Sequence, residues 1–185
     1  MDLSKSPALH MQTPMGSLNL RRELPADIAA IREVETTAFG QPNEAALVDA
    51  LRKARALTLS GVAEFSGKIV GHIAFSSVEV EGGRETFDAL ALAPVAVHPD
   101  WQRKGIGSAL IRWSLDECAQ DGHSLVIVVG HHEYYPRFGF VPAMPLGIRC
   151  PFEVPSEVFM LLELRPGALA GRTGTVRYRP EFDGL

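Results

Sequence analysis

The sequence predicts one α/β (α+β) domain in which helices flank a mixed, mostly antiparallel sheet. Three apolar segments in a row, separated by Ser-Gly and Gly-Gly turn signals, indicate an antiparallel meander over residues 57–97. A strand–helix–strand unit over residues 87–130 adds a parallel connection to this sheet. The chain has 185 residues, 46% hydrophobic and 22% charged, which is enough to bury one core.

The two ends of the chain lack the periodicity of the middle. Residues 1–16 are polar and contain proline, which predicts a flexible N-terminal lead-in. The domain is expected over residues 17–165. Glycine and proline recur in residues 166–185, which predicts an irregular C-terminal tail packed on the domain.

Within the domain, each element follows from its hydrophobic period. Alternation predicts strands, whereas apolar residues at i, i+4 and i+7 predict helices. Pro25 suits a first helical turn, and Asn43 is a candidate N-cap. The predicted order is a strand at 18–24, helices at 25–39 and 42–56, strands at 57–65, 68–80 and 86–97, a helix at 107–120, a buried strand at 124–130, a short helical segment at 132–138 and strands near 140–148 and 156–165.

Composition excludes several classes of function. A formal net charge of -4 gives nucleic acid no broad electrostatic reason to bind. No apolar run approaches the roughly 20 residues that cross a bilayer, and no signal peptide is visible. Cys118 and Cys150 fit neither a disulfide framework nor a zinc site, and the adjacent His131 and His132 have no third ligand nearby. We therefore expect a cytoplasmic protein without a metal or a membrane partner.

One loop carries chemistry that the core does not need. The stretch VAVHPDWQRKGIGSALI joins a buried strand to a helix, and Gly105 and Gly107 would let an anion approach the N–H groups at the helix start. Arg103 and Lys104 add positive charge. A Walker loop is absent, and Leu110 stands where a dinucleotide fingerprint needs glycine or alanine. The loop is thus predicted to bind phosphate in another way.

Two motifs carry a resemblance to a known family. The run from Gln102 to Gly107, Q-x-x-G-x-G after a strand ending in VAVHP, resembles the pyrophosphate-binding loop of the GNAT superfamily of N-acetyltransferases. YPRFGF, from Tyr135 to Phe140, resembles the family segment in which a tyrosine precedes Gly-Phe. The run over residues 90–142 is most similar to the bacterial YhbS-like branch.

The resemblance implies the GNAT fold, splayed between its fourth strand and the strand after the helix, with acetyl-CoA as the acetyl donor. An N–H in the segment Val95–Val97 would polarise the thioester carbonyl, an effect of about 3 kcal/mol per donor. The implied CoA-binding residues are Val95, Ala96, Val97, Gln102, Arg103, Lys104, Gly105, Ile106, Gly107 and Ser108.

The resemblance also assigns Tyr135 as the general acid that protonates the departing thiolate. The base is less defined, because the segment LALAPVAV contains no acidic residue where some family members have a glutamate. Candidates are Glu35, Glu79 and Glu81, or a water relay.

Two functions remain open at this point. The first is an N-acetyltransferase acting on a primary amine of a small molecule, a protein or a peptide. The second is a non-catalytic CoA-binding module that serves as a sensor or interaction domain. Whether the chain forms a homodimer is also open.

Overall fold

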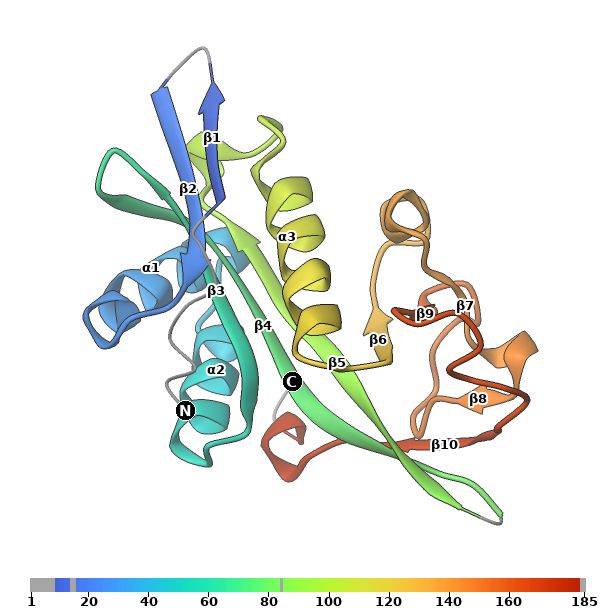
Figure 1. The fold of residues 1–185 in the computed structure, drawn as a ribbon. Helices are drawn as coiled ribbons and strands as arrows, with labels where there is room; N and C mark the ends of the chain where they lie inside the picture. The colour runs from blue at the N-terminus through green and yellow to red at the C-terminus, as the bar shows by residue number, and fades with distance from the viewer. Residues whose placement is uncertain (1–8, 14–15, 84, 184–185) are drawn as a thin grey trace.

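The computed structural model describes residues 9–13, 16–83 and 85–183. Within them, ten strands form one mixed sheet in the order β1-β2-β3-β4-β5-β6-β9-β7, and β10 pairs with β4 and β8 (Figure 1). The strands are β1 (Leu9–Thr13), β2 (Gly16–Arg22), β3 (Leu57–Phe65), β4 (Lys68–Glu81), β5 (Thr86–Val97), β6 (Leu125–Val129), β7 (Val141–Pro142), β8 (Ile148–Arg149), β9 (Phe159–Glu163) and β10 (Gly174–Arg177).

Helices flank both faces of the central strands. In Figure 1, α1 and α2 lie on one side of the sheet and α3 lies on the other. The helices are α1 (Ile28–Phe39), α2 (Asn43–Lys53), α3 (Ile106–Gln120) and the 3-10 turns η1 (Pro25–Asp27), η2 (Pro99–Trp101), η3 (Tyr135–Phe138), η4 (Met144–Leu146) and η5 (Pro180–Phe182). The predicted fold class is confirmed.

Strand alternation in β4 divides its side chains between these two helical layers. A Cβ on Gly71 would lie 3.0 Å from the side chain of Leu110, so this face of β4 meets α3. The next residue, His72, points to the opposite face and hydrogen-bonds Glu35 of α1. Glycine at position 71 therefore lets α3 approach the sheet closely, because any larger side chain would fill that space.

The sheet forks between β5 and β6. These parallel strands pair only at Leu90 with Val126 and at Ala91 with Ile127. Beyond that point β5 continues to Val97 without β6 as a neighbour, while the other edge of β6 stays paired with β9. The fork leaves backbone groups of β5 without a strand partner, which opens a binding position in the middle of the sheet.

Three expectations for the ends and the irregular parts were wrong. The predicted tail contains β10, because β3 pairs with β4 only from Ser76 toward Lys68 and leaves the β4 edge at Glu79–Glu81 open for β10. The predicted lead-in contains β1, although residues 1–8 and 14–15 lie outside the described part of the chain. The strand expected at 140–148 is reduced to β7, η4 and β8, since Pro142 and Pro145 cannot donate to a ladder.

The domain boundaries at residues 17 and 165 stay a prediction. Among the residues that the structure describes, no helix is long and apolar enough to span a membrane.

Candidate functional site

The N-terminus of α3 is open to a ligand. Gly105 is its N-cap and has φ 83°, a left-handed conformation that favours glycine. No described side chain caps the helix, and the first backbone N–H bonded within it is that of Ala109, which donates to the Gly105 carbonyl at 2.9 Å. The N–H groups of residues 106–108 are thus available to an anion at the positive end of the helix.

The polar side chains of the preceding loop mainly hold the loop itself. Gln102 Nε2 donates to the Val97 carbonyl at 3.0 Å. Lys104 Nζ donates to the Asp100 carbonyl at 2.7 Å. Arg103 is exposed, with φ 58°. Of the predicted phosphate ligands, the backbone of the glycine loop is placed best, because two of the three side chains already have partners.

The end of β5 presents two N–H groups at the fork. The His98 N–H donates to the Val70 carbonyl of β4 at 2.9 Å. Because successive N–H groups of a strand point to opposite sides, those of Val97 and Val95 point away from β4, toward the side that β6 has left. The N–H of Ala96 points to β4, and its side chain is buried. Of the three predicted residues, Val95 and Val97 thus have N–H groups available to a ligand, whereas the N–H of Ala96 faces β4.

Tyr135 is held by packing against the residue that follows β6. Its side chain is 9% exposed and meets Phe140 edge to face at 5.6 Å between ring centroids. A Cβ on Gly130, the residue after β6, would collide with the Tyr135 ring. Burial raises the pKa of Tyr135 to about 12, so the phenol keeps its proton throughout the neutral range.

The neighbouring Tyr134 reaches the helix N-terminus instead. Its hydroxyl lies 3.3 Å from Ser108 Oγ in the first turn of α3. A Cβ on Gly107 would lie 3.1 Å from the same hydroxyl. Tyr134 is a site residue that the local sequence did not indicate, because adjacent residues in the tight turn η3 point in different directions.

Glu35 lies in a buried hydrogen-bond chain. Its side chain is fully buried, and Oε1 lies 2.5 Å from Nδ1 of His72. Nε2 of His72 lies 2.9 Å from Ser60 Oγ, and Ser60 in turn donates to Glu23. Desolvation raises the pKa of Glu35, although the hydrogen bond from His72 opposes the rise.

The other carboxylates proposed as bases lie at the far end of β4. Glu79 is exposed and stands in register with Asp88 on β5 and Arg177 on β10. Glu81 accepts a hydrogen bond from Arg177 Nη1 at 2.7 Å. Glu79 and Glu81 therefore lie far along β4 from His72, which contacts Glu35, and the structure does not bring Glu35 and Glu79 together. The catalytic role of each stays a prediction.

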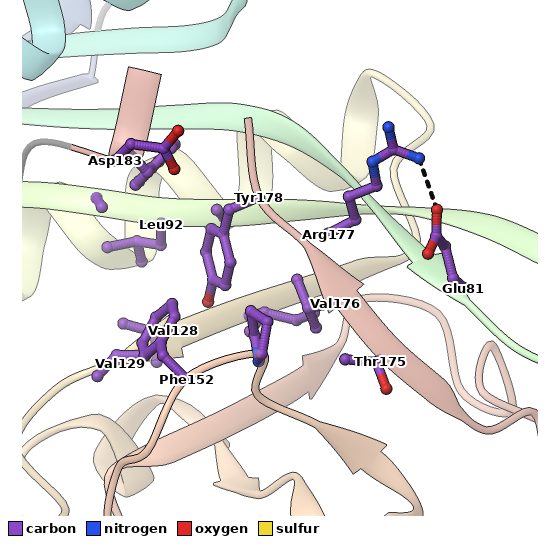
Figure 2. Close-up of a pocket in the computed structure, with 15 residues that line it drawn as sticks. Glu81, Leu92, Val128, Val129, Phe152, Thr175, Val176, Arg177, Tyr178 and Asp183 are labelled. Carbon is purple, nitrogen blue, oxygen red and sulfur yellow. Dashed lines mark hydrogen bonds and ion pairs between the residues drawn. The ribbon is translucent and has the colours of Figure 1, made fainter. Parts of the chain in front are cut away.

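A cavity of about 900 Å³ begins where the β5–β6 ladder ends (Figure 2). Its walls come from β5 and β6 at the fork, from β10 and the segment that follows it, from the loop after β8 and from the end of β4. The lining residues are Glu81, Ala91, Leu92, Ala93, Ile127, Val128, Val129, Pro151, Phe152, Thr175, Val176, Arg177, Tyr178, Phe182 and Asp183. Of the three candidate bases, Glu81 is among them, paired with Arg177, whereas Glu35 and Glu79 are not.

The cavity is mostly apolar, and its charges lie apart. Figure 2 shows the Glu81–Arg177 ion pair at one end and Asp183 near Leu92 at the other. The sequence did not indicate the aromatic and acidic side chains that line the cavity. The only sequence signal was three aromatic residues, Phe152, Tyr178 and Phe182, in segments without periodicity.

A metal centre finds no support in the described residues, where no three His, Cys, Asp or Glu side chains lie close enough to hold an ion.

A forked sheet with an uncapped, glycine-rich helix start beside the fork is the architecture of the acyltransferases that the sequence resembled. Residues 19–143 match the family model described as an acetyltransferase (GNAT) domain. The chain therefore belongs to the GNAT acetyltransferases.

Relatives support this assignment over most of the chain. The N-acetyltransferase YhbS of Escherichia coli is 33% identical over 165 residues, covering 89% of this chain and 98% of YhbS. The N-acetyltransferase YjhQ of the same organism is 41% identical over 135 residues, covering 71% of this chain and 75% of YjhQ.

Solved structures agree with the sequence matches. The crystal structure of E. coli YhbS in complex with CoA superposes with a TM-score of 0.85 at 32% identity, covering 96% of this chain and 94% of that one. A GNAT family acetyltransferase from Brucella melitensis in complex with acetyl-CoA gives a TM-score of 0.75 at 38% identity, covering 90% and 98%.

Proposed function

We propose that this GNAT acetyltransferase uses acetyl-CoA and transfers the acetyl group directly to a primary amine bound in the cavity at the fork. The observation that carries the proposal is that one strand, β5, contributes to two features. Its residues Ala91–Ala93 line the cavity at the last β5–β6 pair, and its open N–H groups at Val95 and Val97 follow toward the start of α3. The CoA and acetyl-CoA complexes of the two similar structures support the choice of donor.

Binding of the donor would depend mainly on backbone groups. The N–H groups of residues 106–108 would hold the pyrophosphate at the start of α3, where the helix dipole favours negative charge. The hydroxyl of Tyr134 and Oγ of Ser108, 3.3 Å apart, would border the phosphates. Gln102 would act indirectly, because its hydrogen bond to Val97 fixes the loop against β5.

The transfer step needs a polarised carbonyl and a proton for the leaving group. The amine nitrogen forms a bond to the thioester carbon, and the carbon–sulfur bond breaks. The N–H of Val95 or Val97 would stabilise the negative charge on the carbonyl oxygen in the tetrahedral intermediate, by about 3 kcal/mol per donor. Tyr135 would donate its proton to the thiolate, because the phenol is protonated at neutral pH; the raised pKa makes it a weaker acid, which limits how much this transfer contributes.

The proton from the amine would leave through water in the cavity. An alkylammonium group has a pKa near ~10.4 and must lose a proton before it can attack. Glu35 is fully buried against His72, and Glu79 lies outside the cavity lining, so neither contacts an amine placed at the fork. Both remain candidate bases that a substitution can test.

A coupled thiol assay tests the proposal. Acetyl-CoA and a panel of primary amines are incubated with the protein, free CoA is measured, and the acetylated product is identified by mass. Amine-dependent CoA release is the expected result. Binding of CoA without release for any amine would favour the CoA-binding module instead. The cytoplasmic location stays a prediction from the sequence, and the question of a homodimer stays open.

A further inference from the structure

The lining of the cavity at the fork narrows the class of acceptor. We infer that the acceptor is a small amine with a single positive charge, an apolar and preferably aromatic body, and no carboxylate. The inference rests on the proposed function and adds the substrate class. It follows from four properties of the cavity: its size, its aromatic wall, the positions of its charged residues and the pairing of the strands around it.

The size and the walls fit a small apolar molecule. A volume of about 900 Å³ lies within the range of pockets that enclose whole small ligands. Phe152, Tyr178 and Phe182 form one aromatic wall, with centroid distances of 5.5 Å and 5.3 Å along the row. Phe152 is 51% exposed, which is unusual for a large apolar side chain beside a cavity and suits contact with a ligand.

The charges fit a single cation close to the fork. Arg177, the one guanidinium in the lining, forms an ion pair with Glu81 at 2.7 Å, in which both side chains are exposed, so its charge is balanced at the rim and not buried in the cavity. Asp183 lines the cavity, is exposed, and takes part in none of the ion pairs among the described residues. Asp183 and Leu92 both line the cavity and are drawn on the same side of it in Figure 2, and Leu92 directly follows the last residue of β5 that pairs with β6. An ammonium group attracted by Asp183 would therefore stand on the fork side of the cavity, where the thioester carbon is expected.

The same charges disfavour two other kinds of amine. A polyamine would bring several ammonium groups to a lining with one unengaged carboxylate, and the remaining charges would face apolar walls. An α-amino acid would bring a carboxylate that meets Asp183 and finds Arg177 already paired. The penalty in both cases comes from burying a charge without a partner.

A peptide acceptor is disfavoured by the strand edges around the cavity. Extended peptides commonly bind by adding a strand to a free sheet edge. Here β10 pairs with β4 along Thr175–Arg177 and with β8 at Gly174 and Thr175, and the edge of β6 away from the fork is paired with β9. The β5 edge that the fork leaves free would be occupied by the bound donor. A peptide backbone in the cavity would find few hydrogen-bond partners, whereas an apolar amine requires none along its body.

The test compares matched amines. The probes are 2-phenylethylamine, phenylalanine with the same body plus a carboxylate, ethylamine with the same ammonium but no ring, spermidine, and a short peptide with a free N-terminus. We expect kcat/KM for 2-phenylethylamine to exceed that for each other probe by 10-fold or more. A higher kcat/KM for phenylalanine, spermidine or the peptide would overturn the inference.

Variants assign the preference to the lining. Asp183→Asn should raise KM for 2-phenylethylamine about 10-fold and leave KM for acetyl-CoA unchanged, while Glu157→Gln, at an exposed carboxylate outside the lining, should change neither. Phe152→Ala should lower the ratio of kcat/KM between 2-phenylethylamine and ethylamine. An unchanged ratio together with an unchanged KM in Asp183→Asn would place the acceptor elsewhere.

Failure of the inference and of the proposed function give different results. Acetylation of all probes with similar kcat/KM would reject the acceptor class and leave the acetyltransferase standing. If the protein binds CoA but releases no CoA from acetyl-CoA with any probe or other amine, both the acceptor class and the proposed function are rejected.

Discussion

Removing the hydroxyl of Tyr135 separates binding from chemistry. Tyr135→Phe keeps the edge-to-face contact with Phe140 and the close packing on Gly130. No described residue forms a hydrogen bond with this hydroxyl, so the substitution leaves no buried partner unpaired. We therefore expect the free energy of unfolding to change by less than about 1 kcal/mol.

The expected catalytic loss is about 100-fold in kcat. Loss of a general acid typically costs 10²- to 10⁴-fold, and a thiolate is a fair leaving group near neutral pH, which favours the low end. A 100-fold loss corresponds to about 2.7 kcal/mol in the barrier. The raised pKa of about 12 means that Tyr135 stays protonated in wild type up to about pH 11, so its ionisation should not lower kcat between pH 7 and 10.

The measurement is steady-state CoA release with acetyl-CoA and an amine varied separately, with calorimetry for CoA binding. Tyr134→Phe is the matched control, because it removes the hydroxyl of the adjacent tyrosine, which lies at Ser108 in the first turn of α3. We expect the control to raise KM for acetyl-CoA a few-fold with a small effect on kcat. A Tyr135→Phe variant with wild-type kcat would refute the assignment, and a loss confined to acetyl-CoA binding would make the hydroxyl a binding group.

Three further predictions concern the loop, the base and the pH dependence of stability. Gly107→Val would place a branched side chain against the Tyr134 hydroxyl and over the open N–H groups, so calorimetry should show at least 10-fold weaker CoA binding with the fold retained; unchanged affinity would reject the pyrophosphate site. Glu35→Gln and Glu79→Gln should each keep kcat within about 3-fold if water accepts the proton, and a 100-fold loss in either would identify the base. Asp27 is hydrogen-bonded by an arginine, which holds its pKa below the usual value. Its stabilising contribution is therefore complete above about pH 4 and lost as the pH falls through the lowered folded-state pKa, so denaturant unfolding at pH 2–5 should show a weaker acid loss in Asp27→Asn; an equal loss would assign the effect to other carboxylates.

Long, periodic segments were predictable, because their signal is local. Residues 57–65 became β3 with the predicted bounds, and the helix expected at 107–120 begins one residue earlier in the structure. The sequence predicted a helix start at Gly105 and Gly107, and in the structure Gly105 is the N-cap and Ile106 the first helical residue. Backbone periodicity and the need for glycine at a positive φ depend on neighbours in the chain, so they can be deduced without the fold.

Side-chain environments were not predictable in the same way. Nothing near Glu35 in the sequence indicates that His72, which comes from a strand far along the chain, removes this carboxylate from solvent. Equally, the two adjacent tyrosines look interchangeable until η3 directs Tyr134 to Ser108 and packs Tyr135 against Phe140.

The sequence by itself determined the family, the strand–helix–strand unit and the glycine loop at the start of α3. Tertiary structure alone decided that the tail from β10 to Asp183 returns along the open edge of β4 and forms one wall of the cavity at the fork. The physical reason is that strand pairing and burial join residues far apart in the chain. Which edge is free, and which side chains then face the same space, is fixed only when the whole sheet has formed.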